Sequence, residues 1–457
     1  MTRVCVIGLD CLTPQLVFSR WRNELPCLSH LASSALAGPI ESTVPAISIP
    51  AWTSLVTGVD PGTLGTYGFH DRADYGYLHM KLNSSQDYEV PTLWTVLSRA
   101  GLGSRVAFVP QTFPPKPFAG FLIAGIPAPA ALLPHTHPPE LASELAHRWG
   151  ELGLDVKDFR QQDRMHLWRQ VTALTERNFA LARAWLAESD WRFFMMVEIG
   201  ADRIQHGYWQ YLDQQHPRYS ADAQQGRVVC DYYCLLDREV GRLLEVLRED
   251  DIVIIVSDHG AQSCRGGLAL NDVLVELGYL RLRGAPREIT ALRTEDVDWR
   301  RSRAWASGGH VGRIYVNVHG REPEGIVTEK DVPALLDELG AALIKTRGPR
   351  GELLATTVYR PSRIYRNVRG IAPDLLVYLD DLAWRAIGSV GHSSIYEDGS
   401  TVGLDGASHS RLGTLILRDG RGARAAPAGL SLYDIAPTVL DRLNVPIPPY
   451  MIGRVLY

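Results

Sequence analysis

The chain has 457 residues, of which 46% are hydrophobic and 21% are charged, and its formal net charge is −4. This composition supports a packed core and excludes a disordered or collagen-like chain, while the length allows one large domain with insertions or a few smaller ones. The small negative charge argues against a protein that coats nucleic acid.

Short apolar segments alternate along the chain with longer helical patterns. The predicted strands are Arg3–Leu9, Arg105–Val109, Phe121–Ala124, Arg192–Glu198, Asp251–Val256, Arg313–Val318, Asp374–Leu379 and Gly413–Leu417. The predicted helices are Pro91–Ala100, Met165–Ala187, Tyr232–Leu247, Asp331–Ile344 and Leu432–Leu443. Several strands are apolar at successive positions, as expected for strands that are covered on both faces. The alternation predicts an α/β domain with a largely parallel central sheet.

One region departs from this alternation. Residues from about 266 to 365 are irregular and rich in arginine, with GG at 308–309 and RGPRG at 347–351. We therefore expect a core made of residues 1–265 and 366–457, with residues 266–365 forming an inserted lobe or cap near the active site.

The amino terminus and the cysteines bear on the compartment. The first residues, MTRVCVIGLD, do not form a charged lead, an apolar region and a cleavage site, so no secretory signal is expected. No apolar run approaches the ~20 residues of a membrane-spanning helix. The six cysteines contain no CxxC pair and no zinc-finger spacing. We expect free thiols, no transmembrane segment and a cytoplasmic location.

Carboxylates and imidazoles follow the predicted strands. In α/β sheets, ligands gather beyond the carboxyl ends of parallel strands. Three aspartates and three histidines lie in or near such positions: Asp10, Asp202, His206, Asp258, His259 and His409. Taken singly, each has an ordinary alternative as a solvated aspartate, a turn residue or a core histidine. Their joint occurrence favours a metal site.

The residue types indicate which metals to expect. A mixture of carboxylate and imidazole suits zinc, with manganese or iron as alternatives. Six such ligands exceed what one tetrahedral site needs, and two cations about 4 Å apart would use them better.

A serine hydroxyl near the start of a predicted helix is a second candidate functional group, beside the metal ligands. The stretch 42–58 predicts a loop followed by a helix, and Pro50 stands where a first-turn proline is favoured, so Ser48 falls close to the N-cap. A serine there faces free N–H groups and the positive end of the helix, which stabilise a bound phosphate. The alternative is that Ser48 simply caps the helix.

Together these motifs resemble the alkaline phosphatase superfamily, and within it the bacterial type I phosphodiesterase and phosphohydrolase/phosphomutase branch. The matching motifs are VIGLD (6–10), SIPAWTSLVTG (48–58), PTLW (91–94), ADRIQHGYW (201–209), VSDHG (256–260), NVHGREPEG (317–325), DGASH (405–409) and DIAPTVL (434–440). They span almost the whole chain in the order typical of the family. The resemblance implies an alkaline-phosphatase-like, three-layer α/β/α fold with a largely parallel central sheet and an inserted lobe.

The resemblance also implies roles for individual residues. Asp10, Asp258 and His259 match the ligands of one metal, which the nucleophile Ser48 also touches. The ligands of the other metal are matched by Asp202, His206 and His409. Trp52 stands where related sulfatases carry an arginine, and position 48 is not a cysteine, so a formylglycine sulfatase is not expected.

The sequence thus predicts a phosphoric ester hydrolase that uses two divalent metal ions, with zinc favoured. Its substrate is expected to be a small-molecule phosphate ester, a diester rather than a monoester, cleaved through a phosphoseryl intermediate on Ser48. Arg203, His310 and His70 are candidate substrate contacts. The alternative for Arg203 is a surface salt bridge, and the alternative for the two histidines is a solvated loop position.

Two other functions stay open at this point. A phosphomutase or phosphoryl-transfer enzyme of the same superfamily would let a substrate hydroxyl, rather than water, intercept the phosphoserine. A non-catalytic binding protein that kept the fold is less favoured, because the six ligands and Ser48 are all present. The sequence carries no signal for an oligomeric state.

Overall fold

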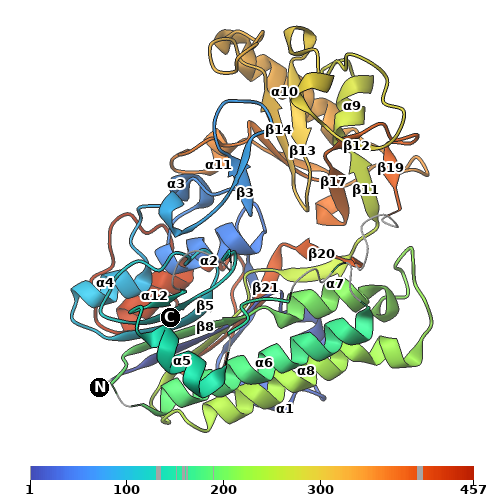
Figure 1. Cartoon of the computed structure of the whole chain (residues 1–457). Helices are drawn as coiled ribbons and strands as arrows, with labels where there is room; N and C mark the ends of the chain where they lie inside the picture. The colour runs from blue at the N-terminus through green and yellow to red at the C-terminus, as the bar shows by residue number, and fades with distance from the viewer. Residues whose placement is uncertain are drawn as a thin grey trace.

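A nine-stranded sheet lies at the centre of the fold (Figure 1). The computed structural model describes residues 2–129, 135–150, 152–156, 160, 163–188, 190–398 and 405–457. The strand order is β22-β2-β21-β9-β1-β8-β5-β6-β7. Five neighbouring strands run parallel: β9 (Ile252–Val256), β1 (Val4–Leu9), β8 (Phe193–Glu198), β5 (Ser104–Val109) and β6 (Gly120–Ala124). The largely parallel sheet predicted from the sequence is confirmed.

The flanks of the sheet are of mixed direction. Next to β9, strand β21 (Leu412–Arg418) runs antiparallel, and it pairs antiparallel with β2 (Leu36–Glu41), which meets the two-residue strand β22 (Arg424–Ala425). At the other edge, β7 (Thr136–His137) is antiparallel to β6. The direction of β21 matters for the site, because its first residue lies at the edge of the sheet where the parallel strands end.

Helices cover both faces of the central sheet and make it three-layered (Figure 1). The first face packs against α1 (Pro26–Ser33), α5 (Leu141–Trp149), α6 (Arg164–Ala187), α7 (Gly200–Leu212) and α8 (Ala223–Leu244). The second face packs against α2 (Ser48–Thr57), α4 (Leu93–Arg99) and α12 (Ile435–Arg442). This confirms the three-layer α/β/α architecture.

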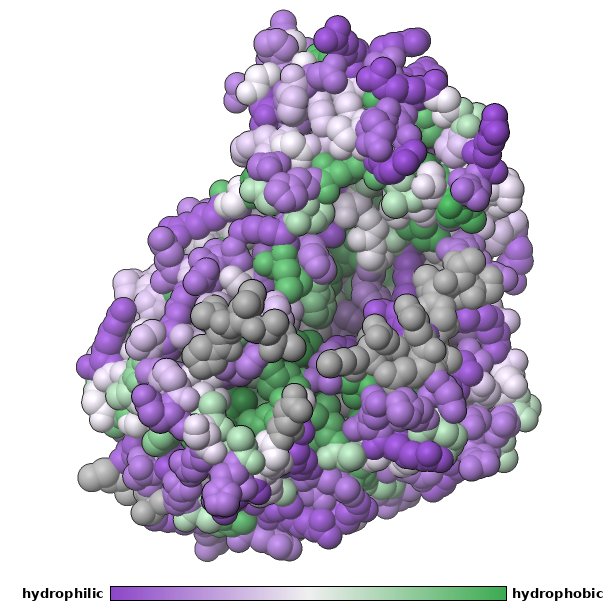
Figure 2. Space-filling view, in the orientation of Figure 1, coloured by the Kyte–Doolittle hydropathy of each residue, from purple (hydrophilic) through white to green (hydrophobic). Residues whose placement is uncertain are grey.

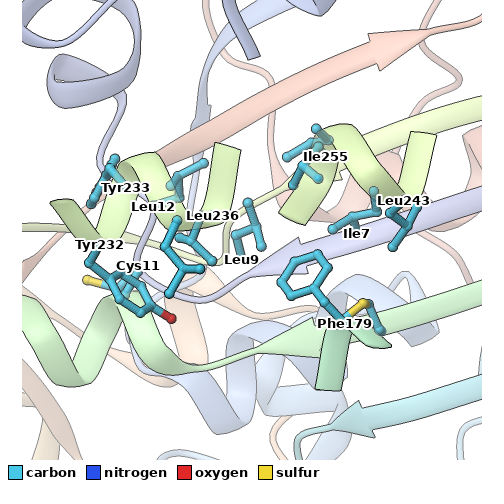
Figure 3. Close-up of a cluster of buried hydrophobic side chains, with 14 of the residues drawn as sticks. Ile7, Leu9, Cys11, Leu12, Phe179, Tyr232, Tyr233, Leu236, Leu243 and Ile255 are labelled. Carbon is cyan, nitrogen blue, oxygen red and sulfur yellow. The ribbon is translucent and has the colours of Figure 1, made fainter. Parts of the chain in front are cut away.

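The central strand β1 shows why such strands read as continuous apolar runs. All six of its residues are buried, with Ile7 and Leu9 facing the first core and Val4 and Val6 facing the second. Figure 3 shows Ile7 and Leu9 close to side chains of α6, α8 and β9. Burial of an aliphatic side chain of this size stabilises the fold by about 1.5–3 kcal/mol.

A second sheet lies apart from the central one, in the upper part of Figure 1. Its antiparallel strands are β13 (Ala304–Ser307), β14 (Gly312–Val316), β16 (Leu375–Tyr378) and β15 (Thr357–Tyr359). Together with α9 (Leu270–Glu276) and α10 (Val332–Ile344) it has a hydrophobic cluster of its own. The division of the chain into a core and an inserted lobe stays a prediction.

Short strands and one-turn helices complete the fold. A three-stranded sheet is formed by β17 (Trp384–Ile387), β11 (Gly266–Ala269) and β19 (Tyr396–Glu397). Three two-stranded pairs are β10 (Gly260–Ser263) with β20 (Ala407–Ser410), β12 (Thr290–Ala291) with β18 (Ser389–Val390), and β3 (His70–Arg72) with β4 (Met80–Leu82). The one-turn helices α3 (Pro61–Leu64) and α11 (Pro361–Ile364) lie in loops.

The predicted strands and helices are all present, with shifted ends. The largest shift is in α8, which begins at Ala223 rather than at Tyr232. The strand β2 was not predicted, because Gly38 and Pro39 interrupt its apolar pattern. The six cysteines are free thiols, as expected. No helix in the described part of the chain is both long enough and apolar enough to span a membrane.

Candidate active site

The carboxyl ends of β1, β8 and β9 bring the first site residues together. These strands are neighbours and run parallel, so the residues that follow them meet at one edge of the sheet. Asp10 follows β1 directly, and Asp258 with His259 comes immediately after Ser257 at the end of β9. Helix α7 begins two residues after β8 and carries Asp202 and His206 one turn apart.

His409 reaches the same edge from the far end of the chain. It lies on β20, where it is paired antiparallel with Ala261 of β10. The chain then enters β21, which runs antiparallel to β9. The reversed direction of β21 therefore places the residues just before it beside the residues just after β9.

Ser48 is the first residue of α2, and its hydroxyl points at these ligands. The N-cap position of the helix belongs to Ile47, so the capping alternative for Ser48 does not hold. Its Oγ lies 3.3 Å from Nε2 of His259 and 3.5 Å from Oδ1 of Asp10. The helix start thus presents the hydroxyl to an imidazole and a carboxylate.

One group of candidate ligands consists of Asp10, Asp258 and His259, whose ligand atoms lie within 4.8 Å of one another. Nε2 of His259 is 3.3 Å from Oδ2 of Asp258 and 3.8 Å from Oδ1 of Asp10. All three side chains are fully buried. Among the described residues, Oδ2 of Asp258 has no hydrogen-bond donor.

The buried carboxylates of this group would be stabilised by a nearby positive charge. Burial raises the pKa of Asp10 well above its ordinary value, and the neighbouring Asp258 and Asp202 carboxylates add to the effect. Burial likewise raises the pKa of Asp258 to about 6. Buried carboxylates with an unpaired oxygen are costly unless a cation compensates them, so the donor set fits a divalent ion.

A second group surrounds Asp202. Its Oδ1 lies 3.2 Å from Nε2 of His206 and 3.7 Å from Nε2 of His409, and the described residues give this oxygen no hydrogen-bond donor. The candidate sets here are Asp202, His259 and His409, and His206, His310 and His409, each with ligand atoms within 4.8 Å of one another. His259 belongs to the first group as well as to one of these sets, so the two groups adjoin.

The histidines are oriented by their other ring nitrogens. Nδ1 of His409 donates to the carbonyl of Ala46 at 2.8 Å, and Nδ1 of His259 donates to the carbonyl of Gly260 at 3.1 Å. Nδ1 of His206 lies 2.6 Å from Oδ1 of Asp405. Such partners fix the tautomer that leaves Nε2 available as a metal ligand.

Several partners of the site residues were not predicted from the sequence. Asp405 accepts hydrogen bonds from Arg385 as well as from His206, and Trp52 donates from Nε1 to Oδ2 of Asp10 at 2.7 Å. Asp405 stands in the DGASH motif, which was a usable signal, whereas Arg385 has no sequence feature that separates it from surface arginines.

The predicted substrate contacts lie around one cavity of about 310 Å³, which Ser48 and His409 also line. Arg203 is buried, binds the partly exposed Asp155 through two hydrogen bonds of 3.0 and 2.6 Å, and also pairs with the buried Asp202. His70 is exposed at the cavity mouth, and His310 is half-buried.

A neighbouring cavity of about 600 Å³ is lined by Ile289, Ala386 and Ile387 and shares Arg160 and residues 308–310 with the first. In the space-filling view, the surface is hollowed between the second sheet and the layer of α6 and α8, and hydrophobic residues lie in the hollow (Figure 2).

Comparison with known proteins gives one family and several structural likenesses. The sequence model of the family described as type I phosphodiesterase / nucleotide pyrophosphatase matches residues 4–407. No curated protein sequence matches the chain.

Human ectonucleotide pyrophosphatase / phosphodiesterase 5 has a similar structure, with a TM-score of 0.58 at 15% identity, covering 99% of this chain and 97% of that one. Phosphonoacetate hydrolase from Sinorhizobium meliloti 1021, solved in complex with phosphonoformate, gives a TM-score of 0.61 at 14% identity, covering 96% of this chain and 95% of that one. At such identities these likenesses show the fold.

Proposed function

The chain belongs to the type I phosphodiesterase / nucleotide pyrophosphatase family, and we propose that it hydrolyses phosphodiesters through a phosphoseryl intermediate on Ser48, assisted by two divalent cations. The observation that carries the proposal is the position of the Ser48 hydroxyl, 3.3 Å from His259 and 3.5 Å from Asp10, at the start of a helix. The family makes the chain a phosphoester hydrolase, and the serine mechanism and metals are the further step.

The two groups of ligand atoms are the residues that would hold the cations. Asp10, Asp258 and His259 would hold one of them next to Ser48. Asp202 would hold the other together with His206 and His409, whose Nε2 atoms lie 3.2 and 3.7 Å from its Oδ1. When bound, such cations supply positive charge that lowers the pKa of the serine hydroxyl and neutralises the phosphoryl oxygens. Zinc is favoured by the mixture of imidazole and carboxylate, with manganese or iron as alternatives.

Ser48 carries the covalent chemistry. In the first step a bond forms between Oγ of Ser48 and phosphorus, the bond from phosphorus to one ester oxygen breaks, and one alcohol leaves with a proton. In the second step the oxygen of a water molecule forms a bond to phosphorus, the bond between Oγ and phosphorus breaks, and one proton of the water passes to Oγ, which restores the hydroxyl and releases a monoester. Because Ser48 opens α2, the phosphoryl group would lie at the positive end of that helix.

The charges around the cavities favour a diester over a monoester. Among the described residues that line the two cavities, each arginine is paired with a carboxylate: Arg160 and Arg385 with Asp405, Arg203 with Asp155 and Asp202, and Arg313 with Asp71. A monoester dianion would find little unbalanced positive charge beyond the cations. A diester carries a single negative charge and therefore needs less unbalanced positive charge around it.

The test is turnover of bis-p-nitrophenyl phosphate and p-nitrophenyl phosphate by purified protein of measured metal content. We expect two bound divalent ions per chain and at least about tenfold higher kcat/KM for the diester. Transfer of the phosphoryl group to an added alcohol in place of water would favour the phosphoryl-transfer alternative. Protein that binds no metal and turns over neither ester would favour the non-catalytic alternative.

A further inference from the structure

A fourth histidine lies beside the second group of ligands, and it comes from a different part of the fold. His310 stands in the loop between β13 and β14 of the second sheet, and its ligand atom lies within 4.8 Å of those of His206 and His409. We propose that His310 is an additional protein ligand of the cation held by Asp202, His206 and His409, so that this cation ties the second sheet to the central one. The inference rests on the proposed function, which supplies the cation.

The rings of three histidines are stacked at this point. The His259 and His409 rings lie 3.7 Å apart at an interplanar angle of 18°, and the His409 and His310 rings lie 4.0 Å apart at 17°. The His310 ring is also 5.4 Å from that of His206. His310 therefore extends an array of imidazoles whose other members already face the candidate metal groups.

The hydrogen bonds of His310 follow the pattern of the other three. In each of the four histidines, Nδ1 is directed at a protein oxygen: Asp405 Oδ1 for His206, Gly260 O for His259, Ala46 O for His409 and, at 3.5 Å, Ser408 Oγ for His310. A metal-binding histidine ordinarily uses its second ring nitrogen in this way. The partner of His310 immediately precedes His409 in the chain, so the two imidazoles are held by one strand, β20.

The backbone before His310 is fixed by the protein itself. Gly309 forms two backbone hydrogen bonds with Ala386 of β17, of 2.8 and 2.9 Å. A Cβ atom on Gly308 would lie 2.6 Å from Ala386 O and from Gly388 N, and Gly309 has a φ of +135°. Both positions therefore require glycine, and the Gly-Gly pair sets where His310 enters the cavity.

The competing role for His310 is that of a substrate contact, as expected from the sequence. A substrate contact would leave metal affinity unchanged and raise KM. A metal ligand changes the affinity and the coordination of one cation in the absence of any substrate. These two roles differ in a measurement that needs no turnover.

The experiment compares wild-type protein with His310→Ala and with His70→Ala as the matched control. His70 lines the same cavity but belongs to none of the candidate ligand sets of the described residues. Metal affinity is measured by competition with a chelator, and coordination by the visible absorption of the cobalt-substituted protein. We expect His310→Ala to weaken one of two sites at least about tenfold and to change its cobalt spectrum, with the other site unchanged. His70→Ala should match the wild type in the metal affinity of both sites and in the cobalt spectrum.

Amide hydrogen exchange tests whether the bound cation links the second sheet to the central sheet. In the wild type, added zinc should slow amide exchange in residues 307–311, whereas in His310→Ala it should not. His310→Gln, which keeps size and polarity, should behave like His310→Ala and serves if the alanine variant fails to fold.

Two results would overturn the inference. Unchanged affinity and an unchanged cobalt spectrum in both variants would remove His310 from the ligand set while leaving the proposed function intact. Wild-type protein that binds no metal at all would remove the proposed function and the inference together.

Discussion

The indole Nε1 of Trp52 donates a 2.7 Å hydrogen bond to Oδ2 of Asp10, inside the buried centre of the protein. This bond occupies one carboxylate oxygen and leaves Oδ1 facing Ser48 and His259. Gly8 makes room for the indole, since a Cβ there would lie 2.6 Å from its ring. A position that is arginine in related sulfatases thus serves here to orient a candidate metal ligand.

Trp52→Phe should therefore weaken the binding of a cation at Asp10 without unfolding the protein. The substitution keeps most of the apolar volume but removes the donor, so Asp10 loses its orientation and we expect affinity at that site to fall about 10–100-fold. Isothermal titration of metal-free protein with zinc measures it. Trp94→Phe is the control, because Trp94 is also buried in the same core and, within the described part of the chain, makes no hydrogen bond to a site residue. Equal affinity in both variants would contradict the orienting role.

Asp405 should strengthen the binding of the second cation by orienting His206, as Trp52 orients Asp10. It is buried and joins His206 to Arg385. We expect Asp405→Asn to lower metal affinity about 10–100-fold and to lower the free energy of unfolding by about 1.5–3 kcal/mol, since charged hydrogen bonds are lost. Asp419→Asn, which disrupts a comparable pair with Arg424 and Arg442 away from the site, should lower stability alone. A variant of Asp405 that keeps full metal affinity would count against this role.

The pairing of arginines with carboxylates predicts how substrate preference can be altered. Arg313 lines the cavity and lies 3.5 Å from Asp71. Asp71→Asn should leave this guanidinium unbalanced and narrow the preference for the diester by several-fold, chiefly through a lower KM for p-nitrophenyl phosphate. Asp337→Asn, which changes the exposed pair with Arg360, is the control. An unchanged ratio of the two kcat/KM values would show that the ion pairs between arginines and carboxylates do not set the preference for the diester.

Glu198 predicts a pH dependence of stability. Burial raises the pKa of this carboxyl from 4.5 to about 7, against the opposing hydrogen bonds from Asn178, Thr175 and Gly200. A carboxyl whose pKa is raised in the folded state destabilises it once ionised, so its penalty is absent below pH 4.5, grows as the pH rises from there, and is complete above about pH 7. A shift of this size corresponds to about 3 kcal/mol.

Glu198→Gln removes the titration. Between pH 5 and pH 8, the free energy of unfolding of the variant should therefore increase relative to that of the wild type by up to about 3 kcal/mol, because only the wild type is destabilised by ionisation. Urea denaturation of the metal-free proteins at both pH values measures the difference. A difference between variant and wild type that does not vary with pH would contradict the raised pKa.

The sequence predicted what depends on local pattern. β1 and β9 are covered on both faces, so their residues are apolar without alternation and the strands could be recognised. Five of the six ligand residues follow the ends of β1, β8 and β9, where the chemistry of α/β folds concentrates, so their convergence could be anticipated. β2 could not be recognised in the same way, because it pairs through a stretch that contains Gly38 and Pro39.

What depends on long-range packing could not be predicted. Asp155 is an aspartate like many exposed ones, and only the folded chain places it against Arg203. The contact of His310 with His409 likewise depends on how the second sheet approaches the first. In both cases the residues are far apart in sequence, and neither the surface preference of aspartate and arginine nor the intermediate burial of histidine points to these contacts.

The central claim is that Ser48 is the nucleophile, and the most direct measurement is the mass of the protein quenched in acid during turnover of bis-p-nitrophenyl phosphate. We predict a p-nitrophenylphosphoryl adduct on the peptide that contains Ser48, its absence in Ser48→Ala, and loss of more than about 100-fold in turnover by that variant with both metals retained. Ser54→Ala, a buried serine of the same helix, should keep the adduct and the activity. Full turnover by Ser48→Ala, or an adduct on another residue, would contradict the account.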